Sequence, residues 1–286
     1  MWGVTGITVK AIYALTPLGP ISISLYRLVL ALPFLAGLVA AKRYDLSMTR
    51  REAVIFGGFG FCSLAVFVTV YFASFAYTTV QHATALLYTA PAFVALLSWI
   101  ILKEHMTKAK VTAVILSVLG AFLIVGILKG GQIFGSRTQI GDWLAIGSGL
   151  AYSSWYIFGK VLGRNRDPAV VCFVGMCFGA LFLLLIALGA GAFQLPDGAI
   201  AWGLLLFLAL VPTVLAYLSY LAGLRLIDAT KASVFALVEP VTAVILGSLI
   251  LHETLSYDSL LGFVLIVSSI VLVSRSTAVT GPKALG

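Results

Sequence analysis

The stretch ATALLYTAPAFVALLSWIILKEHMT, residues 83–107, has a counterpart in ASVFALVEPVTAVILGSLILHETLS, residues 232–256. In each stretch a proline interrupts an apolar run, a glutamate follows thirteen residues later, and a hydroxyl residue stands three further on. The matched pairs are Pro91 with Pro240, Glu104 with Glu253, and Thr107 with Ser256. Proline and glutamate are uncommon inside apolar runs, so these pairs indicate an internal repeat with an offset of 149 residues. Each hydroxyl is well placed to cap the next helix.

The composition of the whole chain is that of a helical membrane protein. Of its 286 residues, 61% are hydrophobic and 10% are charged, and the mean hydropathy is +1.11. A soluble domain carries about 25% charged residues, so a water-soluble or disordered chain is excluded. We expect an all-α polytopic membrane protein with ten transmembrane helices. The predicted spans cover residues 1–15, 20–41, 53–77, 82–102, 110–128, 142–161, 169–190, 199–224, 231–251 and 257–274.

The distribution of lysine and arginine predicts the orientation of these spans. With the N-terminus in the cytoplasm, 14 of the 18 basic residues fall on the cytoplasmic side and 2 fall in outside loops. Because positive charge accumulates in cytoplasmic loops, both termini are expected in the cytoplasm. The net charge of +8 therefore reflects topology, and we expect the lipid bilayer, not nucleic acid, as the surrounding partner.

Each half of the chain holds five predicted spans, which is an odd number, so the second half is inverted relative to the first. We place the first repeat at residues 1–128, the second at residues 142–274, and a cytoplasmic tail at residues 275–286. Inverted repeats around a central site are the architecture of secondary transporters that work by alternating access.

The two repeat stretches, together with Trp2-Gly3 in the first span and Tyr26-Arg27 in the second, resemble the EamA family of the drug/metabolite transporter superfamily. The resemblance runs over nearly the whole chain and is greatest to the YddG-type amino-acid exporters. It implies a ten-helix exporter of small organic metabolites. The first repeat reads Leu102-Lys103-Glu104, where the family often has a small residue before the glutamate.

Three charged side chains inside predicted spans are candidates for a substrate site. Glu239 directly precedes Pro240, and a carboxylate at that depth costs about 3 kcal/mol unless it is paired, protonated or facing water. It either contacts a substrate ammonium group or titrates, or it forms a structural pair. Lys10 either lines the pathway or extends to the membrane surface. For Arg27 we favour a structural role against a neighbouring helix, with substrate contact as the alternative.

The charged residues at span ends have a simpler interpretation. We expect Glu104 and Glu253 to border the start of the following helix, where negative charge is favourable. Lys160 is expected to be an anchor on the cytoplasmic side.

Several aromatic residues lie away from the predicted membrane boundaries, at helical spacing. They are Tyr71, Phe75, Tyr88, Tyr152, Trp155, Tyr156, Tyr217 and Tyr220. Such stripes pack helices together or form the wall of a cavity. If they converge, an aromatic cavity would suit a ligand with an apolar or aromatic side chain.

The matched prolines predict two helix kinks. Proline removes one backbone hydrogen bond and clashes with the preceding turn. We therefore expect Pro91 and Pro240 to be helix hinges, with static packing as the alternative.

These observations favour a secondary transporter that exports small organic metabolites, with amino acids, aromatic ones included, preferred because of the resemblance. An organophosphate or nucleotide-sugar exchanger is the alternative, although it should need more cationic side chains in the cavity. A channel or an intramembrane enzyme lacks its motifs here. We expect no enzymatic activity, no cofactor, no metal, a monomer or weak oligomer, and a multi-pass protein of a bacterial inner membrane.

Overall fold

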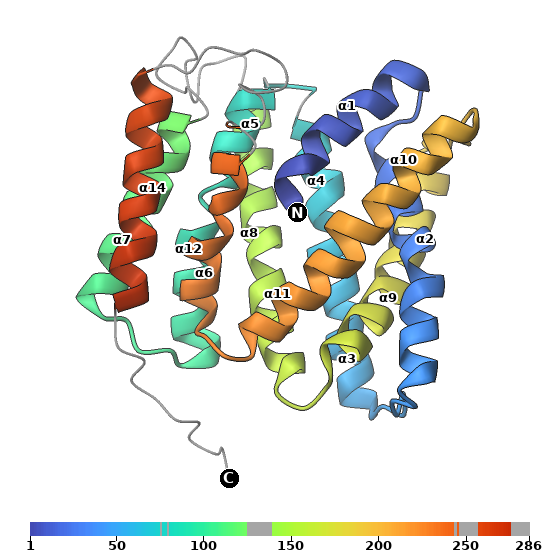
Figure 1. Cartoon of the computed structure of the whole chain (residues 1–286), viewed down its shortest axis with the longest axis horizontal. Helices are drawn as coiled ribbons and strands as arrows, with labels where there is room; N and C mark the ends of the chain where they lie inside the picture. Colours follow the sequence, from blue (N-terminus) through green and yellow to red (C-terminus); the bar gives the residue numbers. More distant parts are fainter. Residues whose placement is uncertain (75, 79, 125–138, 243–244, 246–256, 276–286) are drawn as a thin grey trace.

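The computed structural model describes residues 1–74, 76–78, 80–124, 139–242, 245 and 257–275, and these residues form helices and no β-strand (Figure 1). The α-helices are α1 (Thr5–Leu15), α2 (Pro20–Ala41), α3 (Arg50–Gly58), α4 (Phe67–Ser74), α5 (Val80–Leu87), α6 (Ala90–Leu97), α7 (Lys108–Ile124), α8 (Gln139–Gly163), α9 (Pro168–Gly189), α10 (Ala199–Ala209), α11 (Ala216–Leu224), α12 (Ala229–Ala236) and α14 (Tyr257–Arg275). A 3₁₀ turn, η1 (Trp2–Val4), precedes α1. The π-helical segments η2 (Phe59–Val66), η3 (Ser98–Leu102) and η5 (Leu210–Leu215) continue α3, α6 and α10.

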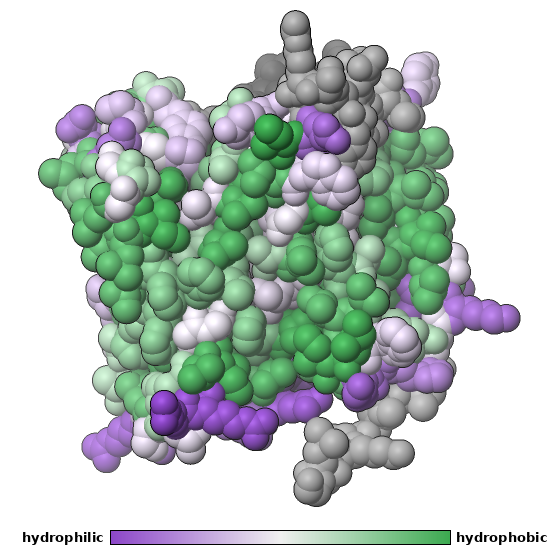
Figure 2. Space-filling view, turned by 180° about the vertical axis from the view of Figure 1, so that it is seen from behind, coloured by the Kyte–Doolittle hydropathy of each residue, from purple (hydrophilic) through white to green (hydrophobic). Residues whose placement is uncertain are grey.

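Four stretches among the described residues are long and apolar enough to cross a membrane. They are Pro20–Ala41, Arg50–Ser74, Pro168–Gly189 and Ala199–Leu224, and Ala90–Leu102 and Leu260–Arg275 are shorter apolar helices. Figure 2 shows apolar side chains over most of the visible face, with strongly hydrophilic ones along its lower edge. Such a band suits contact with lipid, so the chain is a multi-pass membrane protein. The count of ten spans and the side of the termini stay predictions.

Proline explains the π-helical segment η5. Pro212 has no N–H, and its ring clashes with the carbonyl four residues earlier, so the helix widens locally. The carbonyl of Leu208 instead accepts a hydrogen bond from Thr213 Oγ1 at 2.8 Å. The carbonyl of Pro212 itself accepts one from the indole Nε1 of Trp2 at 2.9 Å. This widened turn therefore ties the N-terminal segment to the helix that contains α10 and α11.

Both repeat prolines follow an interruption of their helix. Tyr88 and Thr89 separate α5 from α6, and Pro91 lies in the first turn of α6. In the second half, α12 is followed by a turn at Leu237, three residues before Pro240. The two interruptions occupy matching positions in the repeat, as expected for proline kinks. Whether they act as hinges stays a prediction.

The largest buried cluster joins segments from both halves of the chain. It includes side chains of α2, η2, α8, α9 and α11. One close contact within it depends on glycine: a Cβ at Gly60 would lie 2.5 Å from the Cβ of Phe178 and 2.7 Å from the amide nitrogen of Gly179. The absence of a side chain at Gly60 therefore allows η2 to approach α9. The core holds the two halves together around the site described below.

At the lower end of Figure 1, the α8–α9 loop is bonded to the loop between α2 and α3. The guanidinium of Arg166 donates to both carboxylate oxygens of Glu52, at 2.9 and 3.0 Å. It also donates to the carbonyl oxygens of Asp45, at 3.1 Å, and Ser47, at 2.6 Å. Hydrogen bonds from the Ser47 hydroxyl and amide, with the charge of Arg166 nearby, lower the pKa of Asp45. These bonds link the first half of the chain to the second.

Glu104, near the end of the first repeat stretch, joins the same end of the molecule to α12. The Glu104 carboxylate accepts hydrogen bonds from Ala229 N at 2.7 Å and Thr230 Oγ1 at 2.9 Å. Glu104 borders the capped start of α7, as predicted, but its carboxylate bonds to a different helix. The chain turns at Glu104 so that its side chain meets the free N–H groups of a helix 125 residues away. Close by, Lys110 Nζ pairs with Asp228 Oδ2 at 2.8 Å.

Two other expectations about span ends can be compared with the structure. Thr107 caps α7 as predicted, because Lys110 N donates to Thr107 Oγ1 at 3.2 Å. Lys160 does more than anchor α8 at the surface: its Nζ donates to the carbonyls of Leu224, at 2.7 Å, and Ile227, at 2.6 Å. It thereby caps the C-terminal end of α11. Glu253 and Ser256 lie outside the described residues.

Candidate functional site

A continuous chain of aromatic rings runs between the two halves of the protein. In order, its rings are Tyr71, Phe67, Tyr152, Tyr156, Tyr220, Trp2, Tyr217, Trp155 and Phe59. From Tyr71 to Tyr220, the centroids of successive rings lie 5.9, 4.9, 5.6 and 5.7 Å apart. From Tyr220 to Phe59, they lie 5.2, 5.9, 4.4 and 4.9 Å apart. These spacings are typical of attractive ring pairs. The predicted stripes on α8 and α11 therefore face each other.

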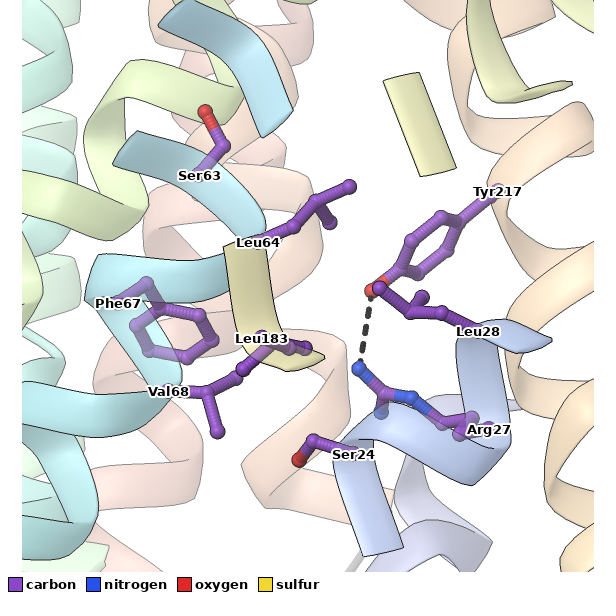
Figure 3. A pocket seen from close by; sticks show the side chains of 9 residues that line it. All are labelled: Ser24, Arg27, Leu28, Ser63, Leu64, Phe67, Val68, Leu183 and Tyr217. Carbon is purple, nitrogen blue, oxygen red and sulfur yellow. Dashed lines mark hydrogen bonds between the residues drawn. The ribbon is translucent and has the colours of Figure 1, made fainter. Parts of the chain in front are cut away.

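A pocket opens beside one part of this ring chain, and Figure 3 shows the side chains that line it. Its polar members are Ser24 and Arg27 from α2, Ser63 from η2 and Tyr217 from α11, and its apolar members are Leu28, Leu64, Phe67, Val68 and Leu183. The space that the centre of a water molecule can occupy among them is about 10 Å³, so the pocket is narrow in this conformation. Phe67 and Tyr217 belong to both the pocket and the ring chain, so the two features form one site.

The guanidinium of Arg27 is the cationic group of this pocket. Its Nη2 donates to the hydroxyl of Tyr217 at 3.4 Å, which is long for a charged hydrogen bond (Figure 3). Its Nε is buried and has no hydrogen-bond partner among the described residues. We favoured a structural role for Arg27 from the sequence, and the structure places it in the pocket wall.

Glu239 supplies an opposite charge to the same region. It lies in the helical segment after α12 and is half-buried. Its carboxylate lies within electrostatic range of Arg27 and of the hydroxyls of Tyr88, Tyr152 and Tyr156. The region therefore holds one guanidinium and several aromatic rings, with one carboxylate near them that does not line the pocket.

The remaining predicted residues differ in their placement. Tyr71 belongs to the ring chain, and its hydroxyl lies 2.7 Å from that of Thr84. Tyr88 packs instead against a separate apolar cluster that includes Leu237 and Val241. Phe75 and the side chain of Lys10 lie outside the described part of the chain.

Sequence reasoning did not select several side chains of this site. Trp2, Phe59 and Phe67 complete the ring chain, and Ser24 and Ser63 line the pocket. The signal for Phe67 was present, because it lies four residues before Tyr71 and so shares its helix face. Trp2 carried no such signal, since its position depends on the π-helical turn at Pro212.

The described residues contain no group of three or more His, Cys, Asp or Glu side chains that could hold a metal ion.

Comparison with known proteins decides the family. The profile of the EamA-like transporter family matches residues 1–126 and 139–275. This chain belongs to the EamA-like transporter family. An uncharacterised transporter of Archaeoglobus fulgidus is 26% identical over 274 residues, which cover 95% of this chain and 93% of that protein. The uncharacterised transporter YvbV of Bacillus subtilis is 27% identical over 208 residues, which cover 71% of this chain and 66% of YvbV.

The fold of this EamA-like chain also occurs in a solved crystal structure. The two share a TM-score of 0.81 over 96% of this chain and 92% of the other, at 18% sequence identity. This similarity concerns the fold alone. Family membership and the named relatives indicate a membrane transporter with a small-molecule substrate.

Proposed function

We propose that the protein exports amino acids, aromatic ones included, through a central cavity by alternating access. The observation that carries this proposal is the convergence of rings from both halves of the chain beside Arg27 and Glu239. A free amino acid has one carboxylate, one ammonium group and a side chain. A site with one guanidinium, one carboxylate and an aromatic wall is complementary to all three.

The proposal includes the architecture that such a cycle needs. Residues 1–128 and 142–274 form two inverted five-helix repeats, with both termini and the tail of residues 275–286 in the cytoplasm. The protein is a multi-pass protein of a bacterial inner membrane and works as a monomer or weak oligomer. Support comes from the matched prolines, which follow helix interruptions at corresponding positions.

Uptake into proteoliposomes tests the substrate class. Purified protein is reconstituted, and the entry of labelled phenylalanine, alanine, glycerol 3-phosphate and a nucleotide sugar is compared with entry into protein-free liposomes. Each substrate is assayed with and without an imposed pH gradient. We expect phenylalanine transport above background and no phosphate-ester transport. Selective transport of a phosphate ester would replace this proposal with the exchanger alternative.

A further inference from the structure

Unpartnered hydrogen-bond donors are concentrated at the candidate site. Within the described residues, Arg27 Nε and Trp155 Nε1 are buried side-chain donors without a partner, and Ser98 Oγ is a third such atom elsewhere. Leaving such a group unbonded costs about 1–3 kcal/mol, more if it is charged. The first two belong to the pocket and to the ring chain, which indicates that this region accepts a polar ligand.

The chemistry of the pocket wall selects the kind of ligand group. Arg27 offers up to five N–H donors in a planar fork, and only a 3.4 Å bond to Tyr217 is made within the pocket. The other polar members of the wall are hydroxyls, and none of the nine lining residues is acidic. A guanidinium among hydroxyls is complementary to an anion. The only cationic side chain in this wall suits a singly charged group better than a doubly charged phosphate.

We infer that Arg27 is the carboxylate subsite of the transporter, and that a substrate carboxylate replaces the Tyr217 hydroxyl on its guanidinium. This inference rests on the proposed function, because it assigns one end of the amino acid. The bond to Tyr217 is weak enough to exchange for a charge-assisted bond. Phe67 and the Tyr217 ring border the same pocket. The centroid of the Trp155 ring lies 4.4 Å from that of the Tyr217 ring. In the substrate-bound state, in which the pocket must be wider, these rings receive the apolar part of the substrate.

The assignment also separates the roles of the two charges. Arg27 holds the carboxylate, and Glu239 is left to face the ammonium group. A ligand without a carboxylate should therefore ignore changes at Arg27. This expectation distinguishes a binding role from the structural role, because a structural arginine would affect every ligand equally.

Binding of four small probes to the purified protein tests the inference. The probes are L-phenylalanine, 3-phenylpropionate without the ammonium group, phenylethylamine without the carboxylate, and phenyl phosphate. Arg27→Gln should weaken binding of the first two at least about tenfold and leave phenylethylamine within about twofold. Arg27→Lys should fall between, since it keeps the charge and loses the fork. Tyr217→Phe should bind phenylalanine as tightly as the unaltered protein or more tightly.

Controls keep the outcomes distinct. Arg225→Gln removes an exposed positive charge after α11 and should change no affinity. Thermal unfolding shows whether each variant is folded, and Arg27→Lys is used instead if Arg27→Gln does not fold.

Equal loss of phenylethylamine and phenylalanine binding in either variant would overturn the subsite, even if phenylalanine is transported. So would tighter, Arg27-dependent binding of phenyl phosphate than of phenylpropionate. Arg27-dependent phenylpropionate binding without amino-acid transport would keep the subsite and reject the proposed function, and binding of no probe would reject both.

Discussion

Phe67 stands where the pocket meets the ring chain. It contacts Tyr71 and Tyr152 at centroid distances of 5.9 and 4.9 Å, and it lines the pocket. A ring pair contributes about 0.5–1.5 kcal/mol beyond burial, which corresponds to a factor of about two to ten in affinity. We therefore expect Phe67→Leu to lower phenylalanine uptake by that factor and alanine uptake less. Phe34→Leu, at a side chain of α2 that is 46% exposed, is the matched control and should have no effect. Equal losses for both amino acids would assign Phe67 to helix packing.

Single residues also show what the sequence could and could not predict. The aromatic stripes were found because their spacing along α8 and α11 is a local property of the chain. The partner of Glu104 could not be found in this way, because it depends on how α12 is placed 125 residues later. Arg27 was underestimated for the same reason, since its pocket is assembled from four different helical stretches.

Lys103 gives a physical reason for a feature of the repeat motif. It ends η3 in the left-handed region, with φ 56° and ψ 33°, where a residue without Cβ is favoured. This turn directs Glu104 toward α12. The small residue that the family often has before the glutamate fits such a position, and Lys103 occupies it here with some strain. The motif therefore encodes a backbone turn.

Helix packing can be tested with a pair of neighbouring glycines. A side chain at Gly60 would meet Phe178 and the α9 backbone within 3 Å, whereas a Cβ at Gly57 has no atom within 4 Å. We expect Gly60→Ala to destabilise the protein by about 1–3 kcal/mol because η2 must move away from α9. Gly57→Ala should be neutral or stabilise it by up to about 1 kcal/mol through helix propensity. Thermal unfolding in one detergent compares them. Equal stability of the two variants would show that the η2–α9 contact is loose.

The matched prolines allow a test of helix bending. Pro91→Ala and Pro240→Ala restore a backbone donor and remove the clash with the preceding turn. If both interruptions are hinges, each variant should slow turnover much more than it weakens substrate binding. The two should also shift cavity accessibility in opposite directions, because the halves are inverted in the proposed architecture. Labelling of a cavity cysteine from each side of the membrane measures the shift. The same shift in both variants, or normal turnover in both, would leave the prolines as packing residues.

Across the whole molecule, hydrogen bonds join the two halves at both ends. At one end Ser22 Oγ donates to the carbonyl of Ala192 at 2.7 Å and Thr78 Oγ1 donates to Asp142 Oδ1 at 3.0 Å. The other end carries the α2–α3 and α8–α9 loops (Figure 1). Arg166 bonds Glu52, Glu104 caps α12, and Lys110 pairs with Asp228. In the proposed topology this end is cytoplasmic. These bonds join parts that would have to separate for a central cavity to open inward, so they resist opening toward the cytoplasm. The bonds at the other end resist opening outward in the same way.

Weakening the bonds at the cytoplasmic end should therefore expose the pocket to the cytoplasm. The reporter is Ser24→Cys, a pocket residue, in a background with Cys62, Cys172 and Cys177 replaced by serine. We expect Glu104→Ala to raise its labelling rate from the cytoplasmic side by about tenfold, since it removes charge-assisted bonds to a helix start. Arg166→Gln should raise it less, by about two- to fivefold, because the Arg166–Glu52 pair is partly exposed.

Two comparisons separate a gate from a general loss of structure. Lys108→Gln removes an exposed charge at the same end and should leave labelling unchanged. Exchanging the charges, with Glu52→Arg and Arg166→Glu together, should lower the labelling rate below that of either single change. The recovery should be partial, because a glutamate at position 166 cannot donate to the carbonyls of Asp45 and Ser47. Because opening inward closes the other side in alternating access, faster cytoplasmic labelling must be matched by slower labelling from outside. A rise from both sides at once would mean that the helices had merely loosened, and these bonds would then be structural rather than part of the transport cycle.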